Sequence, residues 1–187
     1  MNPHDAEQGR LLVALARNAI ARKLRQSPST DDQHPAWLDE PGAVFVTLTQ
    51  HGGLRGCIGS LEAHRSLRED IQANAQAAAF DDPRFPPLSE DELDTTRVEV
   101  SILSRPEPMH FRDETDFLTQ LRPGIDGVIL EYGWHRATFL PQVWEQLPEP
   151  RQFMANLKRK AGLSADFWSN EIRISRYSVE KFKEGAS

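Results

Sequence analysis

The stretch AVFVTLTQHGGLRGCIGS, residues 43–60, decides the fold. Residues 43–50 are rich in Val, Phe and Thr, a composition that is typical of a β-strand. Residues 54–60 follow after the short turn His51-Gly52-Gly53 and are expected to form the returning strand. Two strands joined by so short a turn pair as an antiparallel hairpin, so this segment predicts antiparallel sheet.

Outward from this hairpin, the sequence predicts both helices and further strands. Helices are expected at residues 10–25, 66–79, 113–121 and 150–161. Further strands are expected at residues 97–104, 125–132, 136–140 and 171–178, while residues 183–187 are expected to fray. Only Gly133-Trp134-His135 separates two of these strands, which predicts a second hairpin. Because hairpins outnumber strand–helix–strand units, the sequence favours an α+β fold over a doubly wound parallel sheet.

The composition is that of a soluble domain. The chain has 187 residues, of which 39% are hydrophobic and 27% charged, as in ordinary globular proteins. No apolar run approaches the roughly 18 residues that a membrane span needs. The first residues also lack the basic and then apolar order of a signal peptide. We therefore expect a cytoplasmic protein with no independent second domain.

The charge distribution bears on the partners that the chain could bind. A net charge of −6 argues against DNA as a partner. Residues 151–183 nevertheless hold eight basic and three acidic residues, a net +5. Such a stretch is more often a solvated helix face, and RNA or nucleotide binding through it is the alternative.

Chemistry is most concentrated around Cys57, the single cysteine of the chain. Gly56 and Gly59 flank its strand segment, and glycine in a strand indicates a bulge or the close approach of another backbone or a ligand. In regular strand geometry Arg55 shares a face with Cys57. Its guanidinium would favour the thiolate, which is the nucleophilic form, and could also hold a carboxylate or phosphate. The alternative is that Cys57 is a small buried apolar side chain.

A functional cysteine would need a base, and histidine is the usual one. His64 is the nearest histidine after Cys57, and His51 in the predicted turn is the other candidate. Neither spacing guarantees contact, and a histidine in a connecting segment is more often simply solvated. Since one cysteine cannot form a multi-cysteine zinc site and the glycines match neither a P-loop nor a dinucleotide fingerprint, we expect no metal and no cofactor.

Residues 79–87 form a second candidate region. Pro83, Pro86 and Pro87 make a stiff loop that could hold Asp81, Asp82 and Arg84 in fixed positions, as binding sites require. The alternative is an Asp–Arg pair that only pins the loop.

Several of these segments resemble one family. Residues 54–59, LRGCIG, resemble the signature hexapeptide of the AMMECR domain proteins, known in bacteria as AmmeMemoRadiSam system protein A. Further similar segments lie in the same order at residues 80–88, 99–104, 124–127, 138–144 and 157–163. The resemblance implies an α+β fold with two lobes of antiparallel sheet flanked by helices, in one domain over residues 1–187. It places the hexapeptide near the cleft between the lobes.

The resemblance also implies partners, namely a Memo-type protein similar to extradiol dioxygenases and a radical SAM protein, but it supplies no established reaction. Our first hypothesis is an enzyme component with an unknown small-molecule ligand, and the second is a non-catalytic adaptor for these partners. RNA or nucleotide binding is a distant third. In the first hypothesis the cleft lies around residues 55–59. Cys57 is then the nucleophile or substrate contact, His64 the acid or base and Arg55 the anion anchor. The cleft is lined by Gly56, Ile58 and Gly59, with Asp81 and Arg84 at its rim.

Overall fold

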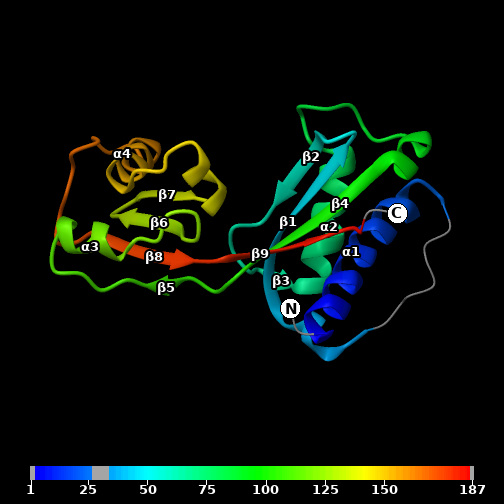
Figure 1. The fold of residues 1–187 in the computed structure, drawn as a ribbon, viewed down its shortest axis with the longest axis horizontal. Helices are drawn as coiled ribbons and strands as arrows, with labels where there is room; N and C mark the ends of the chain where they lie inside the picture. Colours follow the sequence, from blue (N-terminus) through cyan, green and yellow to red (C-terminus); the bar gives the residue numbers. More distant parts are fainter. Residues whose placement is uncertain (1–2, 27–33, 186–187) are drawn as a thin grey trace. The chain divides into compact units, whose positions relative to one another are not determined.

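The computed structural model describes residues 3–26 and 34–185, and it divides the chain into two compact units. The first unit contains the described residues up to Leu103 together with those from Glu180 onward, so both ends of the chain build it. The second unit is the segment Ser104–Val179. Figure 1 shows each unit as a sheet with its own helices. The expected single domain stays a prediction, as does the position of the hexapeptide in a cleft.

The first unit is built on a five-stranded sheet. Its strands are β1 (Pro41–Gln50), β2 (Gly53–Gly59), β3 (Arg65–Ser66), β4 (Thr96–Leu103) and β9 (Val179–Lys183). The order is β2-β1-β4-β9, with β3 paired to β1, so β2 is an edge strand (Figure 1). Strand β1 pairs antiparallel with both β2 and β4. The predicted hairpin at residues 43–60 is therefore confirmed.

Two helices, α1 (Pro3–Lys23) and α2 (Leu67–Phe80), cover one face of this sheet. They share one apolar cluster with Val44, Val46 and Leu48, the inward-facing residues of β1. Helix α2 begins where the sequence predicts, because the Ser66 hydroxyl and the Glu69 carboxylate form a capping box. Short 3₁₀ turns at Ala36–Asp39 (η1) and Glu90–Thr95 (η2) complete the unit.

The second unit is a four-stranded sheet in the order β5-β8-β6-β7. The strands are β5 (Glu107–Pro108), β6 (Gly127–Tyr132), β7 (His135–Phe139) and β8 (Arg173–Tyr177), and the helical elements are α3 (Glu114–Gln120), η3 (Pro141–Glu145) and α4 (Pro150–Lys160). Neighbouring strands pair antiparallel. In the core, Trp144 stacks on Phe153 with ring centroids 3.8 Å apart. Two antiparallel sheets with helices confirm the predicted α+β class.

The C-terminal end differs from the sequence-based expectation. Residues 179–183 form β9 and Glu184 follows in an ordered contact, so the expected fraying does not begin at Lys183; residues 186–187 lie outside the described residues. The backbone N–H of Glu184 donates to the Val98 carbonyl at 2.9 Å, and its carboxylate accepts from Arg17. Residues 179–184 are thus ordered by contacts with residues far away in the sequence, which the local hydrophobic pattern of the segment does not indicate. The predicted loop at residues 27–32 lies outside the described residues.

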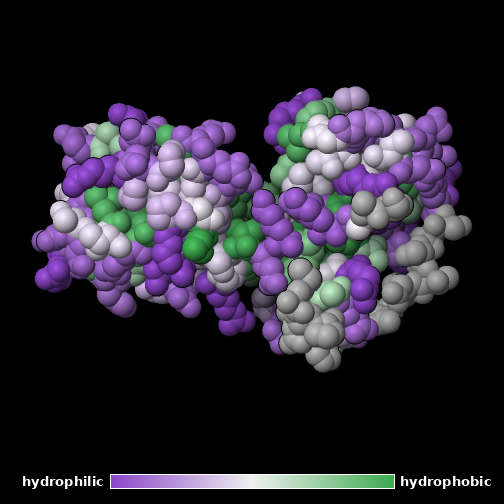
Figure 2. Space-filling view, in the orientation of Figure 1, coloured by the Kyte–Doolittle hydropathy of each residue, from purple (hydrophilic) through white to green (hydrophobic). Residues whose placement is uncertain are grey.

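No helix in residues 3–26 and 34–185 combines the length and the apolar character that a membrane span requires. Figure 2 shows that polar and charged side chains cover most of the visible face of both units, with small apolar patches between them.

Candidate functional site

Cys57 lies on the edge strand β2, opposite Thr47 of β1. Its backbone N–H donates to Asp82 Oδ2 at 2.9 Å, and its carbonyl accepts from Arg84 Nη2 at 3.3 Å. Both groups point away from β1, so Thr47 and Cys57 form a non-hydrogen-bonded pair, in which the facing side chains lie closest. We call these two residues the Asp82–Arg84 clamp. Their side chains bind the backbone N–H and carbonyl of Cys57 that would otherwise be open to pairing with another strand at the sheet edge.

The clamp is held together by its own ion pair. Arg84 donates from Nη2 to Asp82 Oδ2 at 2.7 Å and from Nε to Oδ1 at 3.0 Å. Asp82 is buried, whereas the Arg84 side chain is 53% exposed. The side-chain hydrogen bonds from Arg84, helped by the Cys57 N–H, hold the pKa of Asp82 well below its usual range against the opposing effect of burial. Asp82 is therefore a permanent anion at neutral pH.

The Cys57 thiol faces away from the helices. A Cβ on the neighbouring Gly56 would lie 2.1 Å from the Ala78 carbonyl oxygen of α2, so Gly56 faces α2 and Cys57 faces the other side of the sheet. There Cys57 Sγ lies 3.3 Å from Thr47 Oγ1 and the residue is half-buried. Cys57 does not belong to the apolar cluster of the first unit.

The glycines of the hexapeptide have packing roles. Gly56 lets α2 approach the strand backbone, which is one of the two explanations that the sequence offers for glycine here. A Cβ on Gly59 would lie 2.2 Å from the ring of Phe45, so Gly59 makes room for that ring. Ile58 packs against the core of the first unit. Position 56 and the Ile58 side chain thus face the helices, on the side of the sheet opposite to the thiol.

Arg55 does not follow the regular strand geometry on which its expected position beside Cys57 depends. The register pairs Leu48 with Gly56 and Thr49 with Leu54, so Arg55 is the extra residue of a bulge. Its guanidinium instead binds Glu92 with two bonds, Nε to Oε1 at 2.9 Å and Nη2 to Oε2 at 3.0 Å. The side chain is 9% exposed, and its Nη1 is buried without a hydrogen-bond partner.

Arg84 is the cation that contacts the Cys57 segment. The hydrogen bond and the charge of Asp82 raise the pKa of Arg84 against the effect of burial, and the charge of an ionised Cys57 makes a smaller contribution. Sequence reasoning placed Arg84 at the rim and Arg55 at the anion position. The bulge cannot be predicted from residue types alone, so the sequence does not show that Arg55 pairs with Glu92 while Arg84 contacts the Cys57 backbone.

The ion pair between Glu92 and Arg55 makes the stability of the fold depend on pH. Hydrogen bonds from Arg55, together with the Ser89 N–H, lower the pKa of Glu92 from 4.5 to about 2. Because the pKa is lower in the folded state, the stability that this carboxylate contributes is present above about pH 4.5 and is lost as the pH falls toward 2. We expect the stability difference between wild type and Glu92→Gln to be largest above pH 5 and to shrink on acidification, as urea unfolding at several pH values would show. A difference that grows on acidification would contradict this assignment.

The other predicted residues do not gather around Cys57. His64 is exposed, and its Nδ1 lies 3.0 Å from the Glu62 carbonyl oxygen of its own loop. His51 is exposed in the β1–β2 turn, with a positive φ of 50°. Asp81 is exposed at the end of α2. Within the described residues no hydrogen bond joins Cys57 Sγ to a histidine.

Two residues of the site were not predicted. Thr47 contacts the thiol, and the hairpin register that places it there could be found only by fixing the bulge. Glu92 binds Arg55. The sequence feature that points to Glu92 is the Ser89-x-x-Glu92 capping box, which the structure contains at η2. In the part of the chain that the structure describes, no three His, Cys, Asp or Glu side chains gather as metal ligands would.

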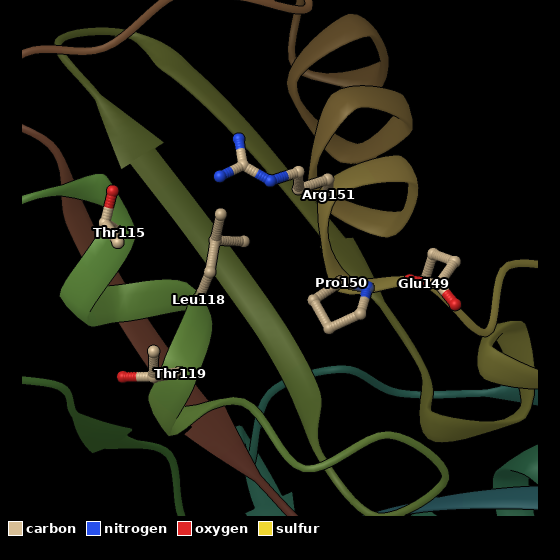
Figure 3. Close-up of a pocket in the computed structure, with 6 residues that line it drawn as sticks. All are labelled: Thr115, Leu118, Thr119, Glu149, Pro150 and Arg151. Atoms are coloured by element: carbon tan, nitrogen blue, oxygen red, sulfur yellow. The ribbon is translucent and has the colours of Figure 1, made fainter.

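A pocket in the second unit contains none of the predicted residues. It lies between α3 and the beginning of α4 (Figure 3). The lining residues are Thr115, Leu118, Thr119, Glu149, Pro150 and Arg151. Figure 3 shows the Arg151 side chain extending from α4 toward α3.

Comparison with known proteins gives a consistent result over nearly the whole chain. The family model described as AMMECR1 matches residues 13–182. A protein of Methanothermobacter thermautotrophicus is 40% identical over 186 residues, which cover 97% of each chain. One of Thermofilum pendens is 38% identical over 196 residues, covering 96% of this chain and 91% of its own. The crystal structure of an uncharacterized protein from Pyrococcus horikoshii superposes with a TM-score of 0.78 at 36% identity, over 96% of this chain and 92% of that one.

Proposed function

The chain belongs to the AMMECR1 family, whose function is uncharacterised, and from this premise we propose that it is the ligand-binding component of an enzyme system, with Cys57 as the group that contacts the ligand. In this proposal it acts in the cytoplasm as AmmeMemoRadiSam system protein A. Its partners are then the Memo-type dioxygenase-like protein and the radical SAM protein.

One observation carries the proposal: a half-buried thiol is held on the sheet face opposite the core by a clamped backbone. A cysteine that serves only packing is usually part of an apolar core, and Cys57 is not. Both backbone polar groups of Cys57 are fixed by the Asp82–Arg84 clamp. Fixed backbone reduces the entropy that is lost when a ligand binds, so the arrangement suits a contact residue.

The chemistry at this position favours an anionic group on the ligand. Arg84 is more than half exposed while its Nε and Nη2 hold Asp82, so a partly exposed guanidinium lies next to the Cys57 backbone carbonyl. In the proposal Arg84 takes the anion-binding role that sequence reasoning gave to Arg55. No base is assigned, because His64 bonds to its own loop instead.

The test compares two alkylating reagents that differ in charge. Iodoacetate is anionic and iodoacetamide is neutral, and both react with thiolate. If Arg84 attracts an anion to the thiol, Arg84→Gln slows the reaction with iodoacetate by roughly two- to threefold more than the reaction with iodoacetamide, the size expected for one exposed ion pair. Arg97→Gln, an exposed arginine on β4, is the control. Equal slowing with both reagents would remove the anion-binding role.

A second candidate is the non-catalytic adaptor. It is favoured by the hydrogen bonding of the sulfur: among the described residues Cys57 Sγ contacts the Thr47 hydroxyl and is bonded to no histidine. Titration of the purified chain with the Memo-type and radical SAM proteins of the same genome tests it, with association at micromolar concentration as the expected result. Absence of binding to both proteins would count against the adaptor and against these partners, and would leave standing only the role of Cys57 as a ligand contact.

A further inference from the structure

The face of the first sheet that carries the Cys57 thiol lies opposite the helical elements of its unit. Among the described residues, helices α1 and α2 and the turns η1 and η2 all contribute to the apolar cluster on the other face. Val44 and Val46 of β1 belong to that cluster, so the alternating residues Phe45 and Thr47 lie on the thiol side. A ligand that contacts the thiol would therefore lie on the side of Phe45 and Thr47.

The Phe45 ring rests on Gly59, close to Cys57. Phe45 and Gly59 are paired in the register of β1 and β2. A Cβ on Gly59 would lie 2.2 Å from Cγ of the ring, 2.5 Å from Cδ1 and 2.6 Å from Cδ2. Because Cγ is nearest and the two Cδ atoms are almost equally distant, a face of the ring, rather than its edge, rests on the strand. The opposite face of the ring points away from the sheet.

This ring takes no part in the core of its unit. Phe45 is half-buried and belongs to neither apolar cluster of the described residues. Gly59, on which the ring rests, follows Cys57 by two residues on the same face, a separation of roughly 7 Å along the strand. An aromatic face at this distance from the thiol is a surface on which a planar group of a ligand can stack.

The strands present no unpaired carboxylate on this face among the described residues. Glu99 of β4, which pairs with Thr47, is bound by Lys183 at 3.2 Å and lies 4.0 Å from Lys181. At the sheet edge the carboxylate of the Asp82–Arg84 clamp is likewise paired, while the Arg84 side chain is 53% exposed. The electrostatics around the thiol therefore suit a ligand with an anionic group.

We propose that the ligand of Cys57 is an aromatic or conjugated carboxylate, whose planar part stacks on the Phe45 ring and whose carboxylate binds Arg84. The inference rests on the proposed function and names the class of ligand for the same site. Cys57 lies beside both groups, because the ring rests on Gly59 and Arg84 donates to the Cys57 carbonyl. A planar group makes more contact with a ring face than a puckered aliphatic group does, so the site discriminates by shape as well as by charge.

Three probes separate the two features of such a ligand. Benzoate is planar and anionic, cyclohexanecarboxylate is anionic but not planar, and benzamide is planar but neutral. Cys57 is alkylated with iodoacetamide over a concentration series of each probe at constant ionic strength, and the slowing of the reaction measures occupancy beside the thiol. We expect benzoate to protect at concentrations roughly threefold lower than those needed for either of the other probes.

Variants assign each preference to a residue. Phe45→Leu should abolish the advantage of benzoate over cyclohexanecarboxylate, whereas Phe182→Leu, on the opposite face of the same sheet, should keep it. Arg84→Gln should abolish the advantage of benzoate over benzamide. Saturation-transfer NMR measures the same preferences without relying on the reactivity of Cys57, and circular dichroism confirms that each variant is folded.

The outcomes separate this inference from the proposed function. It is overturned if benzoate and cyclohexanecarboxylate act alike on the wild type, or if Phe45→Leu keeps the preference, since Phe45 would then only cover Gly59. It is also overturned if benzoate binds without protecting a reactive Cys57, and in that case the proposed function stands. If Cys57 does not react in the folded chain, the proposed function fails, and the NMR preference alone decides whether the ring binds planar anions.

Discussion

Gly56→Ala is expected to lower the free energy of unfolding by roughly 3 kcal/mol, at the upper end of the usual cost of overpacking. The added Cβ would lie 2.1 Å from the Ala78 carbonyl oxygen and 3.0 Å from its carbonyl carbon. Both atoms are backbone of α2, so no side chain can rotate away and the helix must shift from the sheet. Urea unfolding followed by circular dichroism measures the loss.

Two other glycines of the same strand provide controls. A Cβ on Gly53 meets its nearest atom, the Gln50 carbonyl oxygen, at 3.5 Å, so Gly53→Ala should change the stability by less than about 1 kcal/mol. Gly59→Ala should fall between the two, because the atoms it meets belong to the Phe45 ring, which can move. If Gly56→Ala were as stable as Gly53→Ala, the close packing of α2 on β2 would be wrong.

Asp70→Ala is the second substitution with a large expected effect, a loss of roughly 3 kcal/mol or more. The Asp70 carboxylate is buried and accepts from the Val44 N–H at 2.8 Å, the Ser60 hydroxyl at 2.7 Å and Arg65 Nε at 2.7 Å. Alanine would leave these donors without their acceptor, and the first two are buried. The same unfolding experiment measures the effect.

Two control variants in α2 distinguish the loss of the Asp70 charge from a general effect of substitution in this helix. Asp70→Asn keeps the shape but loses the charge, so it should cost less than alanine. Gln72→Ala lies two residues further along α2 and should stay within about 0.5 kcal/mol of the wild type. A loss at Asp70→Ala as small as that at Gln72→Ala would show that the buried network contributes little.

The parts of the fold that local pattern determines could be predicted. The hairpin at residues 43–60 combines β-branched residues with a glycine turn, and α2 begins at a capping box, so each signal lies within a few residues. Strand β9 could not be predicted, because Val179–Lys183 carries only a weak alternation and is ordered by pairing with β4, far away in the sequence. Long-range pairing leaves little trace in a single segment.

The close backbone approach at the hexapeptide could be predicted, whereas the side-chain contacts around Cys57 could not. The glycines around Cys57 indicated close backbone approach, and Gly56 lies against α2. Arg55, however, is the extra residue of the bulge, so it leaves the regular strand geometry and its guanidinium binds Glu92. Short-range spacing also could not show that Asp82 and Arg84 reach back to the backbone of Cys57, which only the path of the loop determines.

The most direct test of the account is the rate at which iodoacetamide alkylates Cys57 in the native chain, measured by intact mass with and without urea. Because this is the single cysteine, each mass increment reports on this position alone. We expect complete modification of the folded protein without urea. We also expect Asp82→Asn, which weakens the clamp, to change the rate while the protein remains folded. A thiol that reacts only after urea unfolds the chain would contradict the account, because Cys57 would then be a buried structural residue.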